Sequence, residues 1–240
     1  MRTWHRWRLS AGSVLVWLIV MTGTAWSATR TWNGNVSSNW SDSNNWSGVT
    51  VPTTGDTVVV GSSANNLCAL GGATQILTTI SVGNTDPTTY GKLIVRSGGV
   101  ITNPVATIGG GINYYGYLEV QSNASFCSGS NYINLTGNGM VNVNGGTLVG
   151  PVAGGSTFAT GTVTVGYGNR PNTGTMNVAN GGYMIGHRVY VGLNGIGVMN
   201  ISNTGTRVEC NYELSIGCAS SNGQAEGTVN LTGGTLSVPG

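Results

Sequence analysis

The stretch Val189-Tyr190-Val191-Gly192 is one copy of a short apolar pattern that recurs along the chain. Six copies are present, each three residues long: Ile80-Ser81-Val82, Ala106-Thr107-Ile108, Ile133-Asn134-Leu135, Val163-Thr164-Val165, Val189-Tyr190-Val191 and Leu214-Ser215-Ile216. Glycine follows five of them directly, and Thr136 takes that place after the third. Successive copies start 25 to 30 residues apart. A regular spacing in the range of about 20–50 residues is typical of repeat architectures, so the sequence predicts stacked copies of one structural unit.

A second motif, Gly-x-apolar-x-apolar, alternates with the first. It begins at Gly91, Gly116, Gly139, Gly174, Gly197 and Gly227. Alternation of apolar residues with a period of two is typical of a β-strand with one buried face. Paired glycines such as Gly181-Gly182 often follow, and a third apolar segment such as Met184-Ile185 comes next. Each period therefore holds about three short strands separated by turns.

Three short strands cannot bury their own apolar side chains, whereas coils stacked about 4.8 Å apart share backbone hydrogen bonds and a continuous core. The sequence therefore predicts an all-β fold, a parallel β-solenoid with a period of about 26 residues. An antiparallel β-sandwich or barrel is the alternative, but it offers no reason for a constant spacing. Glycine accounts for 41 of 240 residues and charged residues for 7%. This composition favours a folded, β-rich chain over a disordered one.

Residues 1–28 have the pattern of a secretory signal peptide. Three arginines lie among the first eight residues, an apolar run covers 11–21, and small residues at 25–28 suit cleavage. An uncleaved membrane anchor is the alternative, because 9–28 contains no charged residue. We therefore expect an exported protein that is extracellular or located at the cell surface. Beyond residue 28, six basic residues accompany seven acidic ones, so we expect no nucleic-acid partner and no membrane insertion by this part.

Residues 29–65 are predicted to form an N-terminal cap, and 66–240 the solenoid repeats. The cap contains Trp32, Trp40 and Trp46 within 15 residues. A solenoid must seal the end of its core, and three large aromatic side chains provide the area for a lid. An aromatic platform for sugars is the alternative interpretation, so these three tryptophans are also candidate ligand-binding residues.

The cap and the repeats resemble secreted bacterial proteins that contain autotransporter-associated β-strand repeats. The matching segments are Thr31-Trp32-Asn33-Gly34, Asn39-Trp40-Ser41-Asp42, Asn45-Trp46, Val51-Pro52 and Gly55-Asp56-Thr57-Val58-Val59. The later Gly-x-Leu-x-Val units resemble the passenger β-helices of the same group, and the whole resemblance covers about 29–238. It implies a right-handed β-helix, associated with the outer membrane or released, with an adhesive or structural role. Autotransporters also have a C-terminal membrane barrel, which 66–240 does not contain, so we expect a fragment or an anchor encoded beyond Gly240.

No catalytic motif is apparent in the sequence, and we predict that the protein is not an enzyme. Lyases and hydrolases built on β-helices need clustered carboxylates, a calcium site or a basic residue on one face. The three aspartates beyond residue 28 all lie within residues 42–86, near the N-terminal end, and His187 is the single histidine beyond residue 28. Glu209 and Glu213 are close in sequence, but the sequence does not settle whether they point to one place. We therefore expect no metal site and no cofactor.

The four cysteines are predicted to remain free thiols: Cys68, Cys127, Cys210 and Cys218. Export permits disulfides, but Cys127 and Cys210 lie three periods apart, about 14 Å along the axis. Bridged Cα atoms lie within about 7 Å of each other. Cys210 and Cys218 flank one strand, so an extended path separates them.

One outward column of the repeats consists of asparagines three positions after the repeat glycine: Asn142, Asn177, Asn200 and Asn230. Stacked side-chain amides can hydrogen-bond along the axis as a ladder. The same alignment places Arg207 in the inward column of Met184 and Leu148, which indicates a local bulge or an error in the alignment.

Variable segments fall at one corner of the coil, at 84–90, 110–115, 167–173 and 218–226. Loops on one side of a repeat rod often bind ligands. They contain five candidate ligand- or partner-binding residues: Tyr90, Tyr114, Tyr115, Tyr167 and Arg170. Aromatic side chains with few charges suit cell-surface glycans or protein receptors as partners. The leading prediction is an exported, non-enzymatic β-solenoid with an adhesin-like or structural role, and a carbohydrate-active β-helix (polysaccharide binding, lyase or hydrolase) is the alternative.

Overall fold

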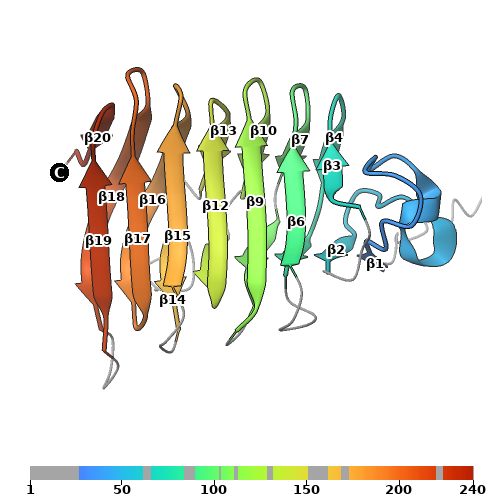
Figure 1. Ribbon diagram of the computed structural model, residues 1–240, viewed down its shortest axis with the longest axis horizontal. Coiled ribbons are helices and arrows are strands. Elements are labelled where there is room, and N and C mark those ends of the chain that lie inside the picture. Colours follow the sequence, from blue (N-terminus) through green and yellow to red (C-terminus); the bar gives the residue numbers. More distant parts are fainter. Residues whose placement is uncertain are drawn as a thin grey trace, which may run out of the picture.

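The computed structural model describes residues 27–61, 66–83, 90–102, 104–110, 113–128, 132–150, 162–168, 173–219 and 224–239. They form a parallel β-solenoid of about seven turns with a period of about 25 residues. The coils stack along one long axis, with the N-terminal segment at one end and the C-terminal strands at the other (Figure 1). These residues contain no α-helix, and two 3-10 turns, η1 (Ser43–Asn45) and η2 (Ser47–Val49), lie near the N-terminal end. None of their helices has the length and hydropathy needed to cross a bilayer.

One face of the solenoid is a seven-stranded parallel sheet in the described chain, which we call the front sheet because it faces the viewer in Figure 1. Its strands are β3 (Cys68–Leu70), β6 (Tyr90–Val95), β9 (Tyr115–Gln121), β12 (Asn138–Asn144), β15 (Thr173–Ala179), β17 (Ile196–Ile201) and β19 (Glu226–Leu231). Each coil therefore contributes one strand to this face.

The other two faces belong to a thirteen-stranded sheet of the described residues. The first of them contains β1 (Thr29–Thr31), β2 (Thr57–Val60), β5 (Thr79–Val82), β8 (Val105–Ile108), β11 (Ile133–Thr136) and β14 (Thr162–Tyr167). The second contains β4 (Thr74–Ile76), β7 (Val100–Thr102), β10 (Ser125–Cys127), β13 (Thr147–Val149) and β20 (Thr235–Ser237). Two long strands, β16 (Tyr183–Leu193) and β18 (Arg207–Cys218), join both faces.

The strand register confirms the alignment of the two glycine-containing motifs. Val165 pairs with Val191, and Val191 pairs with Ile216, in the parallel strands β14, β16 and β18. On the front sheet, Gly174 pairs with Gly197 in the same way. The predicted parallel solenoid is therefore confirmed, and the alternative of an antiparallel sandwich is wrong.

The glycine after the apolar pattern is required by the geometry of the corner. Gly192 has a φ of 80°, a left-handed conformation that is strained for residues with a Cβ atom. A Cβ on Gly192 would collide with the backbone of Glu226 in the next coil, and a Cβ on Gly197 would collide with the carbonyl of Val165. Two backbones approach each other at this corner, which explains the glycine on both sides of it.

Inward side chains from the three faces fill one apolar core. Strand β9 shows how the alternation works, because Leu118 and Val120 are fully buried while Tyr117 and Glu119 face outward and are half-buried. Burial of one such aliphatic side chain stabilises the fold by about 1.5–3 kcal/mol. The same alternation that builds the core therefore sets out a row of polar side chains on the outer surface.

The expected inward position of Arg207 is wrong by one residue. Arg207 pairs with Tyr183 and is exposed, whereas Val208 pairs with Met184 and is buried. The segment between the column asparagine and Val208 is one residue longer than the corresponding segment before Met184. The extra residue is accommodated where Gly205 takes a φ of 81°. The alignment error lay in the length of the turn, and no inward-facing arginine results.

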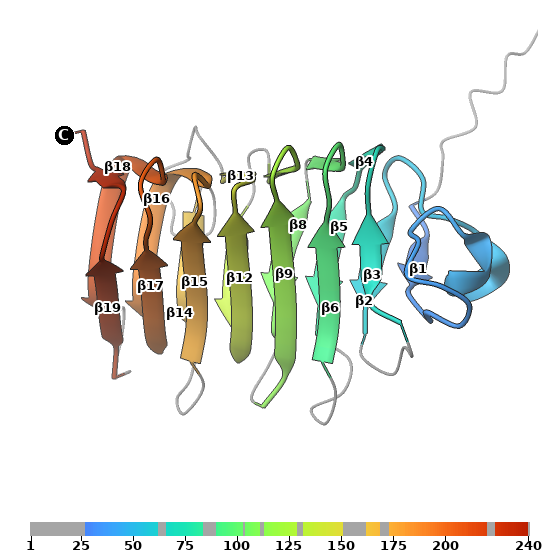
Figure 2. The same cartoon turned by 45° about the horizontal axis from the view of Figure 1, so that its top comes forward.

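The segment that contains η1 and η2 lies at the N-terminal end of the solenoid, beside β1 (Figure 2). Its three tryptophans belong to the buried core cluster. Trp32, Trp40 and Trp46 are at most 2% exposed. Ring centroids lie 5.0 Å apart for Trp32 and Trp46 and 4.7 Å apart for Trp40 and Trp46, in edge-to-face contact. The Trp46 indole donates to the Trp40 carbonyl at 2.7 Å. Because all three rings are buried, we assign them to the lid, and they offer no aromatic platform to a ligand.

Candidate functional site

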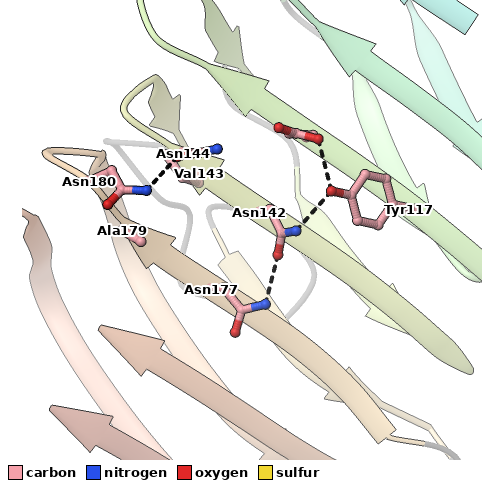
Figure 3. Close-up of a pocket in the computed structure, with 8 residues that line it drawn as sticks. Tyr117, Asn142, Val143, Asn144, Asn177, Ala179 and Asn180 are labelled. Carbon is pink, nitrogen blue, oxygen red and sulfur yellow. Dashed lines mark hydrogen bonds between the residues drawn. The ribbon is translucent and has the colours of Figure 1, made fainter. Parts of the chain in front are cut away.

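A shallow groove lies on the outer surface of the front sheet, over β9, β12 and β15 (Figure 3). It has a volume of about 280 Å³ and is lined by Tyr117, Glu119, Asn142, Val143, Asn144, Asn177, Ala179 and Asn180. Half of these residues are asparagines. The strand alternation turns the polar side chains outward because Leu118, Val141 and Met176 beside them point into the core.

The asparagines of the front sheet form the predicted ladder along the solenoid axis. The Nδ2 atom of Asn177 donates to Oδ1 of Asn142 at 2.7 Å, and Asn200 donates to Asn177 at 2.7 Å. Asn230 donates to Asn200 at 2.8 Å. Each asparagine is also the in-register partner of the next in the parallel sheet. The predicted ladder is therefore confirmed, and all of its amides point in one direction.

Tyr117 and Glu119 fix that direction at the N-terminal end of the ladder. The Tyr117 hydroxyl donates to Oε2 of Glu119 at 2.9 Å, and Nδ2 of Asn142 donates to the Tyr117 oxygen at 2.9 Å. An ionised carboxylate only accepts hydrogen bonds, so the single hydroxyl proton of Tyr117 is directed to Glu119. Asn142 must then turn its own oxygen toward Asn177. Gln121 donates to Oε1 of Glu119 at 3.1 Å, so both carboxylate oxygens are engaged.

Tyr117 stays protonated at neutral pH. Burial raises the pKa of its hydroxyl, and the hydrogen bond to Glu119 and the negative charge of that residue raise it further. The Lys92 ammonium group, from the preceding coil, lies 4.7 Å from the centroid of the Tyr117 ring. A cation at this distance is attracted to the ring face. The groove therefore presents a neutral phenol whose orientation is fixed from two sides.

The repeat pattern did not predict Tyr117, Glu119 or the groove. A signal for Glu119 was present, because it is three positions after Gly116 and pairs with Asn142, so it belongs to the asparagine column. Tyr117 belongs to the neighbouring column, where it pairs with Met140. Its hydroxyl reaches across to the asparagines, and this diagonal contact has no signature in the repeat pattern.

The structure does not bring all the predicted corner residues together in one site. Tyr90 and Tyr115 pair in adjacent coils with ring centroids 4.6 Å apart, and Tyr90 is 66% exposed. Tyr114 directly precedes Tyr115 in the sequence and is half-buried. Tyr167 is exposed at the end of β14, in a later coil. The structure therefore brings Tyr90 and Tyr115 together and places Tyr167 apart from them. Arg170 lies outside the described residues.

A second polar cluster occupies β16 and β18. Glu213 accepts hydrogen bonds from the Tyr190 hydroxyl at 3.1 Å and the Ser215 hydroxyl at 2.8 Å, and Arg188 Nε lies 3.7 Å from Glu213. Arg188 also lies 4.9 Å from the ring centroid of Tyr212. Burial raises the pKa of Tyr190 to about 12, with a further contribution from the charge of Glu213. The charges of this cluster are paired with each other, as expected for a structural network at a sheet surface.

Glu209 and Glu213 belong to different hydrogen-bond networks. Glu209 accepts from the Tyr183 hydroxyl at 2.7 Å and forms an ion pair with Arg207, whereas Glu213 is engaged by Arg188. In the described ranges, no group of three or more His, Cys, Asp and Glu side chains is placed to hold a metal ion.

All four cysteines are free. Cys127 in β10 and Cys210 in β18 are separated by β13 and β16 in the sheet order. Cys210 and Cys218 lie toward opposite ends of the single strand β18. These positions agree with the predicted separation of the cysteines along and across the axis.

A comparison of the chain with protein-family models, curated proteins and solved structures finds no match.

Proposed function

We propose that the protein is an exported, non-enzymatic surface protein that binds neutral glycans on its front sheet. The proposal is based on the groove and its directed row of side-chain amides. The signal-peptide pattern of 1–28 and the resemblance to autotransporter passengers support a location outside the cell, at the outer membrane or in the medium, and an adhesin-like role. A protein receptor is the other class of partner that such a surface accommodates.

The ladder asparagines retain hydrogen-bonding capacity for a ligand. A side-chain amide has two N–H donors and an oxygen with two lone pairs. In Asn177 and Asn200 the ladder uses one donor and one lone pair. One donor and one acceptor therefore remain on each, repeated at the coil spacing of about 4.8 Å. Sugar hydroxyls both donate and accept, so a polyhydroxylated chain along the axis suits this row.

The groove favours uncharged over anionic glycans. Glu119 is the charged residue of its lining, and a carboxylate repels uronate, sulfate and phosphate groups. The nearby Lys92 is already placed against the ring of Tyr117. We therefore expect binding to neutral hexose or pentose polymers.

The same geometry favours binding over turnover. Glycoside hydrolysis by carboxylates uses two of them, about 5–9.5 Å apart. Glu119 is the single carboxylate of the groove lining. One of its oxygens accepts a hydrogen bond from Tyr117 and the other accepts one from Gln121. A carbohydrate-active enzyme is the alternative function, and it differs from a binding protein in releasing new reducing ends.

Affinity electrophoresis in gels containing neutral polysaccharides (xylan, glucan or mannan) or anionic ones (pectin or alginate) tests the proposal. We expect retardation by at least one neutral polymer and none by the anionic ones. The Asn177→Ala variant should bind about tenfold more weakly, which corresponds to one lost hydrogen bond. Thr228→Ala is the matched control, because Thr228 is exposed on the same sheet outside the groove. Equal binding by Asn177→Ala, or reducing ends whose release needs Glu119, would contradict the proposal.

A further inference from the structure

Asp56 is a buried carboxylate in the N-terminal cap (29–65), with 3% of the residue exposed. Its Oδ2 atom accepts hydrogen bonds from the backbone nitrogen of Thr53 at 2.9 Å and from the Thr53 hydroxyl at 3.2 Å. Arg30 Nε lies 3.4 Å from the same oxygen. The Oδ1 atom accepts from the backbone nitrogen of Ala28 at 2.9 Å. One carboxylate thus connects the beginning of the described chain to the turn before β2.

The sheet holds Ala28 in this position. The backbone nitrogen of Thr57 donates to the carbonyl of Ala28 at 2.9 Å, and β1 begins at the next residue and pairs with β2. Ser27, in contrast, is exposed. The bond between Ser27 and Ala28 therefore lies where the chain passes from the exposed surface into the folded sheet.

The sequence around this bond has the pattern of a leader-peptidase site. Ala25 and Ser27 occupy the third and first positions before the bond, and both are small, as such enzymes require. Cleavage one residue later would place Trp26 at the third position and would remove Ala28, the donor to Asp56. The contact between Ala28 and Asp56 thus favours residue 27 over residue 28 as the last residue of the signal.

We propose that maturation hydrolyses the Ser27–Ala28 bond and that the new α-ammonium group of Ala28 forms an ion pair with Asp56. The cleavage event rests on the proposed export, and the choice of bond rests on the contacts of Asp56. Water adds its hydroxyl to the Ser27 carbonyl and a proton to the Ala28 nitrogen, and the C–N bond breaks. The acid proton of Ser27 then passes to the amine, which leaves a carboxylate on the leader and an ammonium group on the mature chain.

Cleavage at this bond strengthens the contact that the precursor already makes. An α-amino group has an ordinary pKa of about 7.7–8.0, so at neutral pH it is largely positively charged. A charge-assisted hydrogen bond is about twice as strong as a neutral one. A buried carboxylate is costly without an opposite charge nearby, and the ammonium group would add a second cation to Arg30. The mature N-terminus is then held against the turn before β2 as a structural part of the N-terminal cap.

The secreted full-length product, expressed with residues 1–240, tests both parts. Edman sequencing and intact mass should give Ala28 as the first residue. Lys92 is the single lysine of the sequence, so this product has two amines, and acetic anhydride can report on each by mass spectrometry. The pH midpoint of α-amine acetylation should lie about one unit higher in the wild type than in Asp56→Asn. The reaction at Lys92, on a different face, should be the same in both proteins.

Each failure has a distinct signature. A secreted protein that starts at Thr29 or later overturns the choice of bond and leaves export intact, whereas a retained chain with residues 1–27 overturns export as well. Equal midpoints in the two proteins overturn the ion pair. If Asp56→Asn does not fold, the wild type alone is decisive, because acetylation of Ala28 should lower its Tm by several degrees. An unchanged Tm after that acetylation overturns the proposal.

Discussion

The hydroxyl of Tyr117 lies 2.9 Å from Oε2 of Glu119, and this contact orients asparagine amides up to four coils away. Because the hydroxyl has one proton, its donation to the carboxylate makes its oxygen the acceptor for Asn142. Hydrogen bonds that point the same way polarise and strengthen one another. The ladder is therefore a row of amides whose shared orientation is set by one carboxylate at its N-terminal end.

Removal of the Tyr117 hydroxyl should weaken the whole row. Tyr117→Phe leaves Nδ2 of Asn142 and Oε2 of Glu119 without this partner, and we expect a loss of about 0.5–1.5 kcal/mol in the free energy of unfolding. Urea denaturation followed by circular dichroism measures it. Tyr90→Phe is the matched control, because Tyr90 is largely exposed. Equal stability of the two variants would show that the contact contributes nothing.

Truncation of the lid should destabilise the protein far more than a surface change in the same segment. Trp46 is 1% exposed and touches both other tryptophans. We expect Trp46→Ala to lose about 3–5 kcal/mol, as buried aromatic truncations do. Val36→Ala is the control, since Val36 is 61% exposed, and surface changes usually stay within about 0.5 kcal/mol. Similar melting curves for the two variants would mean that the tryptophans do not seal the core.

Asp56 should make the N-terminal cap sensitive to acid. Burial opposes its ionisation, but hydrogen bonds from Thr53, Ala28 and Arg30 outweigh burial and lower the pKa of the carboxyl. A carboxyl whose pKa is lower in the folded state stabilises the fold above its unfolded pKa of about 3.9, and this contribution is lost as the pH falls below that value. Denaturation from pH 7 to pH 2 should therefore show a smaller acid-dependent loss in Asp56→Asn than in the wild type. Parallel curves for the two proteins would exclude this role.

The buried thiols should be unreactive in the folded protein. Burial raises the pKa of Cys68 well above its ordinary value and that of Cys210 to about 11. Since the thiolate is the reactive form, neither should react with a disulfide reagent at pH 8. After denaturation without reductant, all four cysteines should titrate. Fewer than four free thiols in monomeric protein would contradict the separation of the cysteines in the solenoid.

The apolar columns of the fold could be predicted from the sequence because glycine and the period-two pattern recur at each coil. The ladder could be predicted for the same reason, since Asn177 and Asn200 occupy one column. Turn length is different, because one added residue near Gly205 changes which side chain faces the core without altering the pattern on either side. The groove also depends on the reach of Tyr117 between columns, which is a property of side-chain geometry. Repeats thus predict register well and contacts between columns poorly.

The ladder, the groove and the lid all depend on parallel stacking of the coils. In the structure Val163 pairs with Val189, and Val165 pairs with Val191. A NOESY spectrum of protein with labelled valine methyl groups should show strong cross-peaks within these two pairs. Strong cross-peaks between Val163 and Val191 and between Val165 and Val189 would instead show antiparallel strands, and they would contradict the parallel solenoid together with the ladder and groove that depend on it.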